Sequence, residues 1–313
     1  MATTSVVVCS YTMSRWESLC ANLRALDAQS RRPDEILLVA DHNPELFDAL
    51  ASLGVGRVLA NTNKRGCAGA RNHGLQAASG EIVAFLDDDA IPERDWFERL
   101  VAPLEANPSV VATSGWVLPE GGNVAAWYPR ELYWVFGCSW AGLEQRQMLR
   151  NPIGASMAWR RSVLSDVGGF NVAIGHVDNP GRPIAGCEET LAGIRSTILT
   201  QGTIVHASDA VVHHYVGPER VSFAYLLRRG WGEGMSKWVV RKLSGEPLRE
   251  EKAYSLRIAA AIATSFVSPR KWRTGLFLTA GLGATAAGYL YGRVALGSLD
   301  PERPEELSPN RTF

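Results

Sequence analysis

Short apolar runs alternate with helical patterns along the first hundred residues of the chain. The runs carry no polar alternation and lie at residues 5–10, 35–40, 57–60 and 81–86. After each run, apolar residues recur at helical spacing, over about residues 14–28, 44–53, 66–78 and 92–104. Uninterrupted apolar strands separated by helices are typical of a parallel sheet covered on both faces. The pattern therefore predicts an α/β fold of Rossmann-like type, with a mostly parallel sheet flanked by helices.

The second half of the chain is less regular. Residues 109–119 predict a further strand, and residues 152–170 predict a strand, a turn and a short helix. Residues 186–202 predict a helix that has acidic residues at its start and Gly202 at its end. Residues 203–216 predict two short strands.

The C-terminal region changes in character and predicts two helices. Residues 274–292 hold no charge, and this length is about what a helix needs to cross a bilayer, but glycine and alanine make the stretch weakly hydrophobic. A bilayer span, a helix lying in the interface and a buried helical pair all remain open for residues 255–297. Pro269 and the basic residues after it form a turn that suits an anionic membrane face. We predict peripheral association with the inner face of the cell membrane.

Composition limits the location and the partners of the protein. The 313 residues have a formal net charge of zero, which argues against a nucleic-acid binder with a broad basic surface. The five cysteines are scattered and form no CxxC pair, so we expect a reducing cytoplasm rather than a disulfide framework or a zinc knuckle. The first residues lack the basic region and cleavage site of a signal peptide, which also favours the cytoplasm.

Three adjacent aspartates, Asp87 to Asp89, follow the fourth apolar run. Ser10 and Asp41 follow the first and second runs in the same way, and the carboxyl ends of parallel strands meet at one edge of a sheet, where ligands bind. Mg²⁺ and Mn²⁺ bind through one or two carboxylates together with substrate phosphates, so the triplet suits a metal–diphosphate site. The alternative is a solvated acidic turn before the next helix.

Four pieces of the sequence together resemble the family 2 glycosyltransferases of the GT-A fold. They are VVVCSYTMSR, ILLVADHN, NKRGCAGARNHGLQAASGEIVAFLDDDAIP and GCEET, within a resemblance that covers about residues 5–240. The resemblance implies a GT-A fold with a C-terminal helical extension. It also implies a metal-dependent, inverting transfer of a sugar from a nucleoside-diphosphate sugar to a hydroxyl acceptor, with Mn²⁺ or Mg²⁺ as cofactor.

The resemblance also implies a division of the chain and a choice of acceptors. A catalytic domain would cover residues 1–220, with a nucleotide-binding half over 1–118 and an acceptor-binding half over 119–220. A helical, membrane-associated region (221–297) and a polar tail (298–313) would follow. The acceptor would be a lipid-linked sugar, a polysaccharide or a small natural product, and the apolar C-terminal region favours the first.

Matching the pieces to the family assigns a donor site. Asp41 would accept a hydrogen bond from the base; many relatives carry two acids there, so this single acid leaves the base open. The glycines of residues 66–69 would let backbone amides approach an anion, and the guanidinium of Arg71 would pair with phosphate oxygens. The alternative for Arg71 is a role in helix capping. The predicted nucleotide-sugar-binding residues are Ser10, Tyr11, Arg15, Asp41, Gly69, Arg71, Asp87, Asp88 and Glu188.

The same matching assigns the metal ligands. Asp89 would bind the metal, and Asp87 would face the metal or the ribose. Asp88 could do either, so the sequence does not order the three. A histidine after the last predicted strand would complete the ligands. That strand ends in the doublet His213–His214, of which we predict His213. The alternative is a purely structural histidine.

The remaining assignments concern the acceptor. The acidic pair of the family corresponds here to Glu188–Glu189, and Glu189 would be the base that deprotonates the acceptor hydroxyl. Favourable charge at a helix N-terminus is the alternative for both acids. Trp140 and Trp231 would bind the acceptor by stacking, although aromatic residues in such positions often belong to the core.

Two other functions compete with the transferase. A nucleotidyltransferase can share the nucleotide-binding sheet, but it usually carries a glycine-rich loop and a lysine directly after the first strand, where this chain reads SYTMSR. A non-catalytic nucleotide-sugar-binding protein would not need the intact aspartate triplet and glutamate pair.

Overall fold

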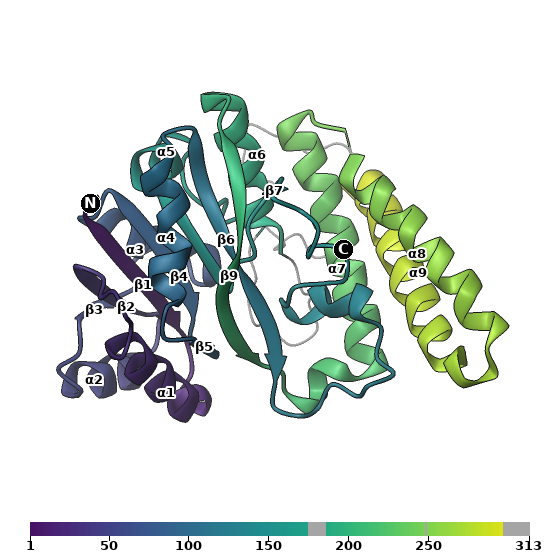
Figure 1. The fold of residues 1–313 in the computed structure, drawn as a ribbon, viewed down its shortest axis with the longest axis horizontal. Helices are drawn as coiled ribbons and strands as arrows, with labels where there is room; N and C mark the ends of the chain where they lie inside the picture. Colours follow the sequence, from purple (N-terminus) through teal and green to yellow (C-terminus); the bar gives the residue numbers. More distant parts are fainter. Residues whose placement is uncertain (175–185, 248, 297–313) are drawn as a thin grey trace.

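One mixed sheet runs through the protein, whose computed structural model describes residues 1–174, 186–247 and 249–296. Within those residues the strand order is β3-β2-β1-β4-β8-β6-β9-β5, and β7 pairs with β9 (Figure 1). The strands are β1 (Thr4–Ser10), β2 (Glu35–Ala40), β3 (Arg57–Ala60), β4 (Ile82–Asp87), β5 (Ala90–Pro92), β6 (Val110–Glu120), β7 (Met148–Leu149), β8 (Ser156–Arg160) and β9 (Thr203–Tyr215).

The predicted parallel arrangement is confirmed for the N-terminal strands. β1 pairs in parallel with β2 and β4, and β2 pairs in parallel with β3. The second half adds antiparallel pairs, because β8 runs against both β4 and β6, and β9 runs against β5 and β7. The whole sheet is therefore mixed, and its parallel part brings the ends of β1, β2 and β4 to one edge.

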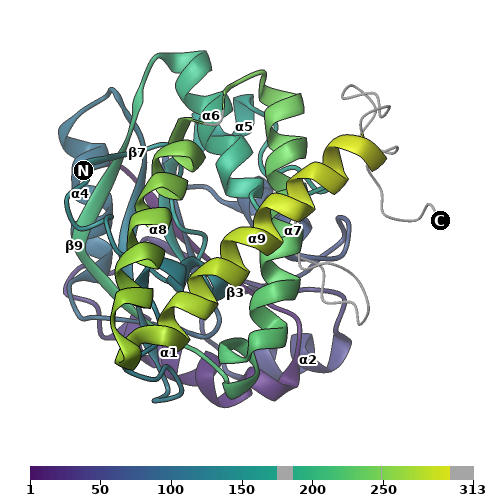
Figure 2. The same ribbon diagram turned by 90° about the vertical axis from the view of Figure 1, so that its right-hand side faces the viewer.

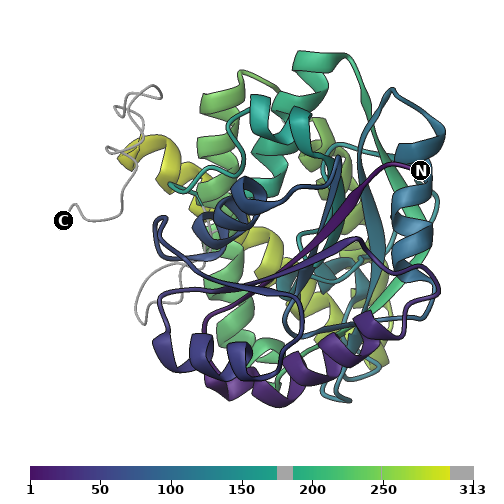
Figure 3. The same ribbon diagram turned by 90° about the vertical axis from the view of Figure 1, so that its left-hand side faces the viewer.

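Helices cover both faces of the sheet, as the apolar runs predicted. Alternate residues of each run face opposite ways: Val6 and Val8 of β1 pack in the cluster that includes α1, α2 and α4, whereas Val7 packs in the cluster that includes α3, α5 and α6. Figure 3 views this layered arrangement from the side of the N-terminal strands. These helices are α1 (Trp16–Asp27), α2 (Pro44–Ser52), α3 (Cys67–Ala77), α4 (Trp96–Ala106), α5 (Arg161–Asp166) and α6 (Glu188–Thr200).

Two details differ from the sequence prediction. Residues 203–216 were expected to form two strands, but β9 is one strand whose pairing with β6 shifts register after Ala207. The exposed pair Ser208–Asp209 lies in that irregular stretch, which explains the break in the apolar pattern. Residues 92–104 were expected to form one helix, but β5 occupies residues 90–92 and α4 begins only at Trp96.

Three long helices form the C-terminal region: α7 (Phe223–Ser244), α8 (Arg249–Val267) and α9 (Trp272–Ala295). A short 3-10 turn, η4 (Pro269–Lys271), joins α8 to α9 and makes a helical hairpin (Figure 2). None of the helices in the described ranges combines the length and the apolarity that crossing a membrane requires. The predicted polar tail over residues 298–313 lies outside the described residues.

Glycines let α9 approach α7 closely. A Cβ atom on Gly234 of α7 would lie 2.0 Å from the Thr285 carbonyl oxygen, and one on Gly288 of α9 would lie 2.1 Å from the Trp231 carbonyl oxygen. The small residues that made this region look weakly hydrophobic thus serve helix packing, and they let α9 lie directly against α7.

Candidate active site

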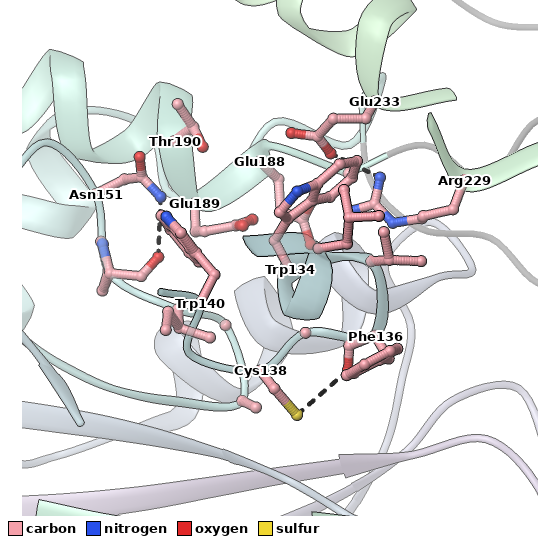
Figure 4. Close-up of a pocket in the computed structure, with 18 of the residues that line it drawn as sticks. Trp134, Phe136, Cys138, Trp140, Asn151, Glu188, Glu189, Thr190, Arg229 and Glu233 are labelled. Atoms are coloured by element: carbon pink, nitrogen blue, oxygen red, sulfur yellow. Dashed lines mark hydrogen bonds and ion pairs between the residues drawn. The ribbon is translucent and has the colours of Figure 1, made fainter. Parts of the chain in front are cut away.

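A cavity of about 890 Å³ lies beyond the ends of β1, β2 and β4 and extends to α7, α8 and α9. Its walls include the sheet-edge residues that the sequence predicted and the first residues of α6. Figure 4 shows part of this cavity, with Glu188 and Glu189 of α6 near Trp134 and Trp140. Of the predicted site residues, those lining the cavity are Ser10, Tyr11, Arg15, Asp41, Arg71, Asp87, Asp88, Asp89, Trp140, Glu188 and Glu189.

Asp88 is the structural member of the aspartate triplet. It is buried, accepts a hydrogen bond from the Ser10 hydroxyl and pairs with Arg15 at 2.9 Å. Burial and the neighbouring charge of Asp89 raise the pKa of Asp88 to about 6, although Arg15 and Ser10 oppose the shift. Ser10 and Arg15 therefore hold the triplet in place.

Asp89 is surrounded by cationic groups. His214 Nε2 lies 2.9 Å from one carboxylate oxygen, and Arg15 and Arg220 lie 3.1 Å and 3.6 Å from the other. Burial favours the protonated form, but these three cations outweigh it and lower the pKa of Asp89. For His214, burial would lower the pKa, but the charge and hydrogen bond of Asp89 raise it well above the usual range.

Asp87, Asp89 and His214 form a group that can hold a divalent cation. One potential ligand atom from each residue lies within 4.8 Å of the other two. Two carboxylates and an imidazole are suitable ligands for a transition metal such as Mn²⁺, and Asp87 remains partly exposed to the cavity. The donor set therefore fits the metal that the sequence predicted.

The histidine of this group is not the one we predicted. Successive residues of a strand face opposite sides, so only one residue of the doublet can face Asp89. His214 does so and is buried, whereas the His213 ring lies 3.1 Å from the Glu93 carboxylate and outside the cavity. The sequence contains both histidines but does not fix which face of β9 each one occupies.

Arg71 connects the candidate metal ligands Asp87, Asp89 and His214, here called the metal group, to the acidic start of α6. Its guanidinium is buried and donates to Asp87 at 2.8 Å, to the Gly154 carbonyl at 3.0 Å and to Glu188 at 3.2 Å. The second Glu188 oxygen, Oε2, is buried and has no hydrogen-bond partner among the described residues. Arg71 thus joins Asp87 to Glu188, the residue that precedes Glu189 in α6.

Glu189 lines the cavity from the start of α6, next to Glu188. Loss of water around the carboxylate, and then the charge of Glu188, raise the pKa of Glu189 to about 8. Its backbone position follows from Cys187, whose positive φ of 73° turns the chain into α6. In the view of Figure 4 the Glu189 carboxylate lies between the rings of Trp140 and Trp134.

Asp41 and Gly69 shape the loop between β3 and α3, beside the cavity. Asp41 accepts hydrogen bonds from Asn61 Nδ2 at 2.6 Å and from the Gly66 amide at 2.8 Å, so it holds this loop while lining the cavity. Gly69 does not line the cavity; a Cβ there would lie 1.7 Å from the Lys64 carbonyl oxygen. The predicted glycine therefore permits close packing of α3 against the loop.

The two predicted acceptor tryptophans lie in different environments. Trp140 lines the cavity, whereas Trp231 does not and packs against Tyr291 of α9, with ring centroids 5.2 Å apart. Trp134 belongs to the aromatic-rich residues 127–140, which by sequence suit either an acceptor platform or the core. It lines the cavity and donates a hydrogen bond to the Tyr254 hydroxyl at 2.7 Å. The sequence did not indicate this contact with Tyr254 of α8.

A buried charge network that the sequence analysis did not identify joins α7 and α8 to the cavity wall. Glu233 pairs with Arg229 at 2.6 Å and with Lys237 at 3.1 Å, and Glu251 pairs with Lys237 at 3.2 Å and with Arg150 at 2.7 Å. Arg150 and Lys237 oppose the burial of Glu251 and lower its pKa to about 2. These pairs fix α8 over the end of the cavity that is farthest from β1, β2 and β4.

The curled mixed sheet with a metal group at its edge is the GT-A fold of glycosyltransferases. Two solved structures share this fold, and their sequence identities to this chain are so low that the likeness concerns the fold alone. A mannosyltransferase from Pyrobaculum calidifontis, in complex with GDP-Man and Mn²⁺, has a TM-score of 0.57 and 21% identity, covering 98% of this chain and 85% of that one. Glucosyl-3-phosphoglycerate synthase from Mycobacterium tuberculosis, with Mn²⁺ and UDP, has a TM-score of 0.51 and 17% identity, covering 79% and 82%.

The sequence comparison narrows the class to a family. The model of glycosyl transferase family 2 matches residues 5–168. A glucosyl-dolichyl phosphate glucuronosyltransferase of Haloferax volcanii is 32% identical over 256 residues, which cover 80% of this chain and 81% of the relative. The chain belongs to glycosyl transferase family 2, which confirms the resemblance seen in the sequence pieces, and it is a glycosyltransferase.

Proposed function

We propose that the protein transfers a sugar from a nucleoside-diphosphate sugar to a hydroxyl acceptor with inversion at the anomeric carbon. The observation that carries this proposal is that Asp87, Asp89 and His214 share one cavity with Glu189. The metal group would hold the diphosphate end of the donor, and the base would act on the acceptor. Arg71 lies between them, near the position where the sugar would bind.

The donor would bind along the ends of β1, β2 and β4. Tyr11 and Asp41 line the cavity at the end where the base would lie, and Arg15 and Arg220 flank Asp89 where phosphates would approach. When bound, a divalent cation would neutralise the charge that develops on the leaving diphosphate. An imidazole in the ligand set favours Mn²⁺ over Mg²⁺, which prefers oxygen ligands.

Glu189 would accept the proton of the acceptor hydroxyl. The acceptor oxygen forms its bond to the anomeric carbon while the bond from that carbon to the diphosphate oxygen breaks, and the electron pair leaves with the diphosphate. A carboxylate whose pKa is about 8 is a stronger base than an ordinary glutamate, although only about one tenth of it is ionised at pH 7. Attack from the face opposite the leaving group gives inversion.

The acceptor end of the cavity suits a sugar that carries an apolar group. Beyond Trp134 and Trp140 its walls come from the C-terminal helices and from the 3-10 helix η2 (Arg130–Phe136). Apolar side chains lining this end are Leu132, Val135, Ile258, Leu282 and Ala286. The Haloferax relative is named for a glucosyl-dolichyl phosphate, and that name also supports a lipid-linked acceptor here.

A transfer assay on the purified full chain tests the proposal. UDP-, GDP- and dTDP-sugars would be supplied with Mn²⁺ and a short-chain lipid-phosphate sugar, and the anomeric configuration of the product would be read by NMR. We expect an inverted product, and Glu189→Gln should lower kcat by about 10²–10⁴-fold while donor binding persists. Glu45→Gln, an exposed glutamate on α2, is the matched control and should be unchanged. A product with retained configuration, or wild-type transfer by Glu189→Gln, would contradict the mechanism.

A further inference from the structure

The hairpin of α8 and α9 has a charge unlike the rest of the chain. The hairpin, residues 249–295, contains seven lysines and arginines and two glutamates, a formal charge of +5. Since the chain has 32 basic and 32 acidic residues, the remainder holds 25 basic and 30 acidic residues and has a charge of −5. The protein as a whole is neutral, but its basic charge is concentrated on one helical element.

The tip of the hairpin combines this charge with exposed apolar side chains. Around η4, Val267 is 84% exposed, Phe266 58% and Trp272 52%. The exposed cations Arg270, Lys271 and Arg273 lie within the same few residues. Figures 1 and 2 show this end of the hairpin projecting from the molecule, at the far side from the N-terminal strands.

The three tip cations are not neutralised within the protein. Among the described residues no carboxylate pairs with Arg270, Lys271 or Arg273, in contrast to the paired arginines of the cavity wall. The Arg273 guanidinium instead lies over the Trp272 ring, 5.6 Å from its centroid. The tip therefore presents a surface that is both basic and apolar.

We propose that the tip of the α8–α9 hairpin docks on the surface of an anionic lipid bilayer. Basic side chains are attracted to anionic headgroups, and tryptophan favours the boundary between headgroups and hydrocarbon. The exposed side chains of Val267 and Leu276 are purely aliphatic. Lipid hydrocarbon chains can bury such side chains, whereas a nucleic acid offers no apolar phase to do so. A symmetric contact with a second copy would bring two basic tips together, so the charge favours a bilayer as the occupant.

Docking in this way also orients the cavity. Tyr254 and Ile258 of α8 and Leu282 of α9 belong to the hairpin and line the acceptor end of the cavity. A docked hairpin therefore brings that end of the cavity close to the lipid. The docking itself does not depend on the transferase activity, so it can be tested without any substrate.

Vesicle sedimentation with the purified full chain tests the proposal. One set of vesicles is phosphatidylcholine alone, and the other contains about one third phosphatidylglycerol. We expect binding to the anionic vesicles that weakens in ~0.5 M salt. Replacing Arg270, Lys271 and Arg273 together by Gln should lower the partition coefficient on the order of 100-fold, since each surface cation contributes on the order of fivefold. The pair Val267→Ser and Trp272→Ser should lower it about tenfold or more.

Matched controls separate the tip from the rest of the surface. Replacing the exposed Arg24, Arg32 and Arg57 by Gln removes three cations from the opposite side, and Leu199→Ser removes an apolar side chain that is 56% exposed. These variants should bind as the wild type does, and all variants should keep its melting temperature. Equal binding to both vesicle types, or undiminished binding of the tip variants, would overturn the proposal. A dimer in sedimentation velocity that the tip substitutions abolish, with no vesicle binding, would also overturn it.

Discussion

Three neighbouring aspartates in one turn have different partners and therefore different roles. Asp88 is fixed by Ser10 and Arg15, whereas Asp87 and Asp89 share a ligand group with His214. The sequence predicted a metal site from the triplet but could not order its members. That order depends on side chains that lie far away in sequence, above all His214 on β9.

The histidine doublet offers a matched pair of variants for the metal site. His214→Ala removes a ligand, and we expect the affinity for Mn²⁺ in the presence of a nucleoside diphosphate to fall about 10–100-fold. His213→Ala removes a ring that faces Glu93 and should leave this affinity unchanged. Isothermal titration calorimetry measures both. If the His213 variant lost the metal and the His214 variant kept it, the geometry of the site would be wrong.

The pH dependence of kcat/KM tests the proposed role of Glu189, because substituting its neighbour Glu188 should shift that dependence. Glu189 acts only when ionised, so kcat/KM should rise as pH passes through about 8. The charge of Glu188 favours the protonated form of Glu189, so Glu188→Gln should lower the pKa of Glu189 and move this rise to lower pH. Glu45→Gln on α2 should leave the midpoint in place. A midpoint that stays or moves upward in Glu188→Gln would contradict the assignment.

Among the helices and strands, the sequence predicted those features that depend on the pattern of neighbouring residues. The four apolar runs gave the parallel strands β1 to β4, and the acidic start at Glu188 gave α6. The pairing of β8 between β4 and β6 could not be predicted, because it depends on contacts between residues distant in the chain. The contact of Arg71 with Glu188 is of the same kind, since 117 positions separate them.

The close packing of α7 on α9 predicts opposite effects for two glycine substitutions. Gly234→Ala would place a Cβ 2.0 Å from the Thr285 carbonyl oxygen, and we expect the free energy of unfolding to fall by about 1–3 kcal/mol. Gly283→Ala lies within α9 with no atom within 4 Å, and should raise that free energy by about 0.5–1 kcal/mol through helix propensity. Urea unfolding measures both. Equal effects of the two substitutions would show that α7 and α9 do not pack this closely.

In the whole molecule, the sheet edge and the C-terminal helices together form the cavity, although the sequence analysis considered these two regions separately. The sheet edge provides the group of Asp87, Asp89 and His214, from the end of β4 and from β9, and the C-terminal helices cover the end beyond Glu189. The weakly hydrophobic residues 274–292 left three interpretations open because composition does not show what a helix packs against. In the structure that stretch belongs to α9, whose Gly288 and Gly292 face α7 and whose apolar Leu282 and Leu290 line the cavity.

A crystal of the full chain soaked with Mn²⁺ and a nucleoside-diphosphate sugar would test the central claim most directly. The anomalous signal of manganese locates the ion independently of the protein atoms. We predict an ion bound by Asp87, Asp89 and His214 and by the diphosphate, with the anomeric carbon of the sugar facing the Glu189 side of the cavity. An ion elsewhere in the cavity, or a sugar directed away from Glu189, would contradict the account.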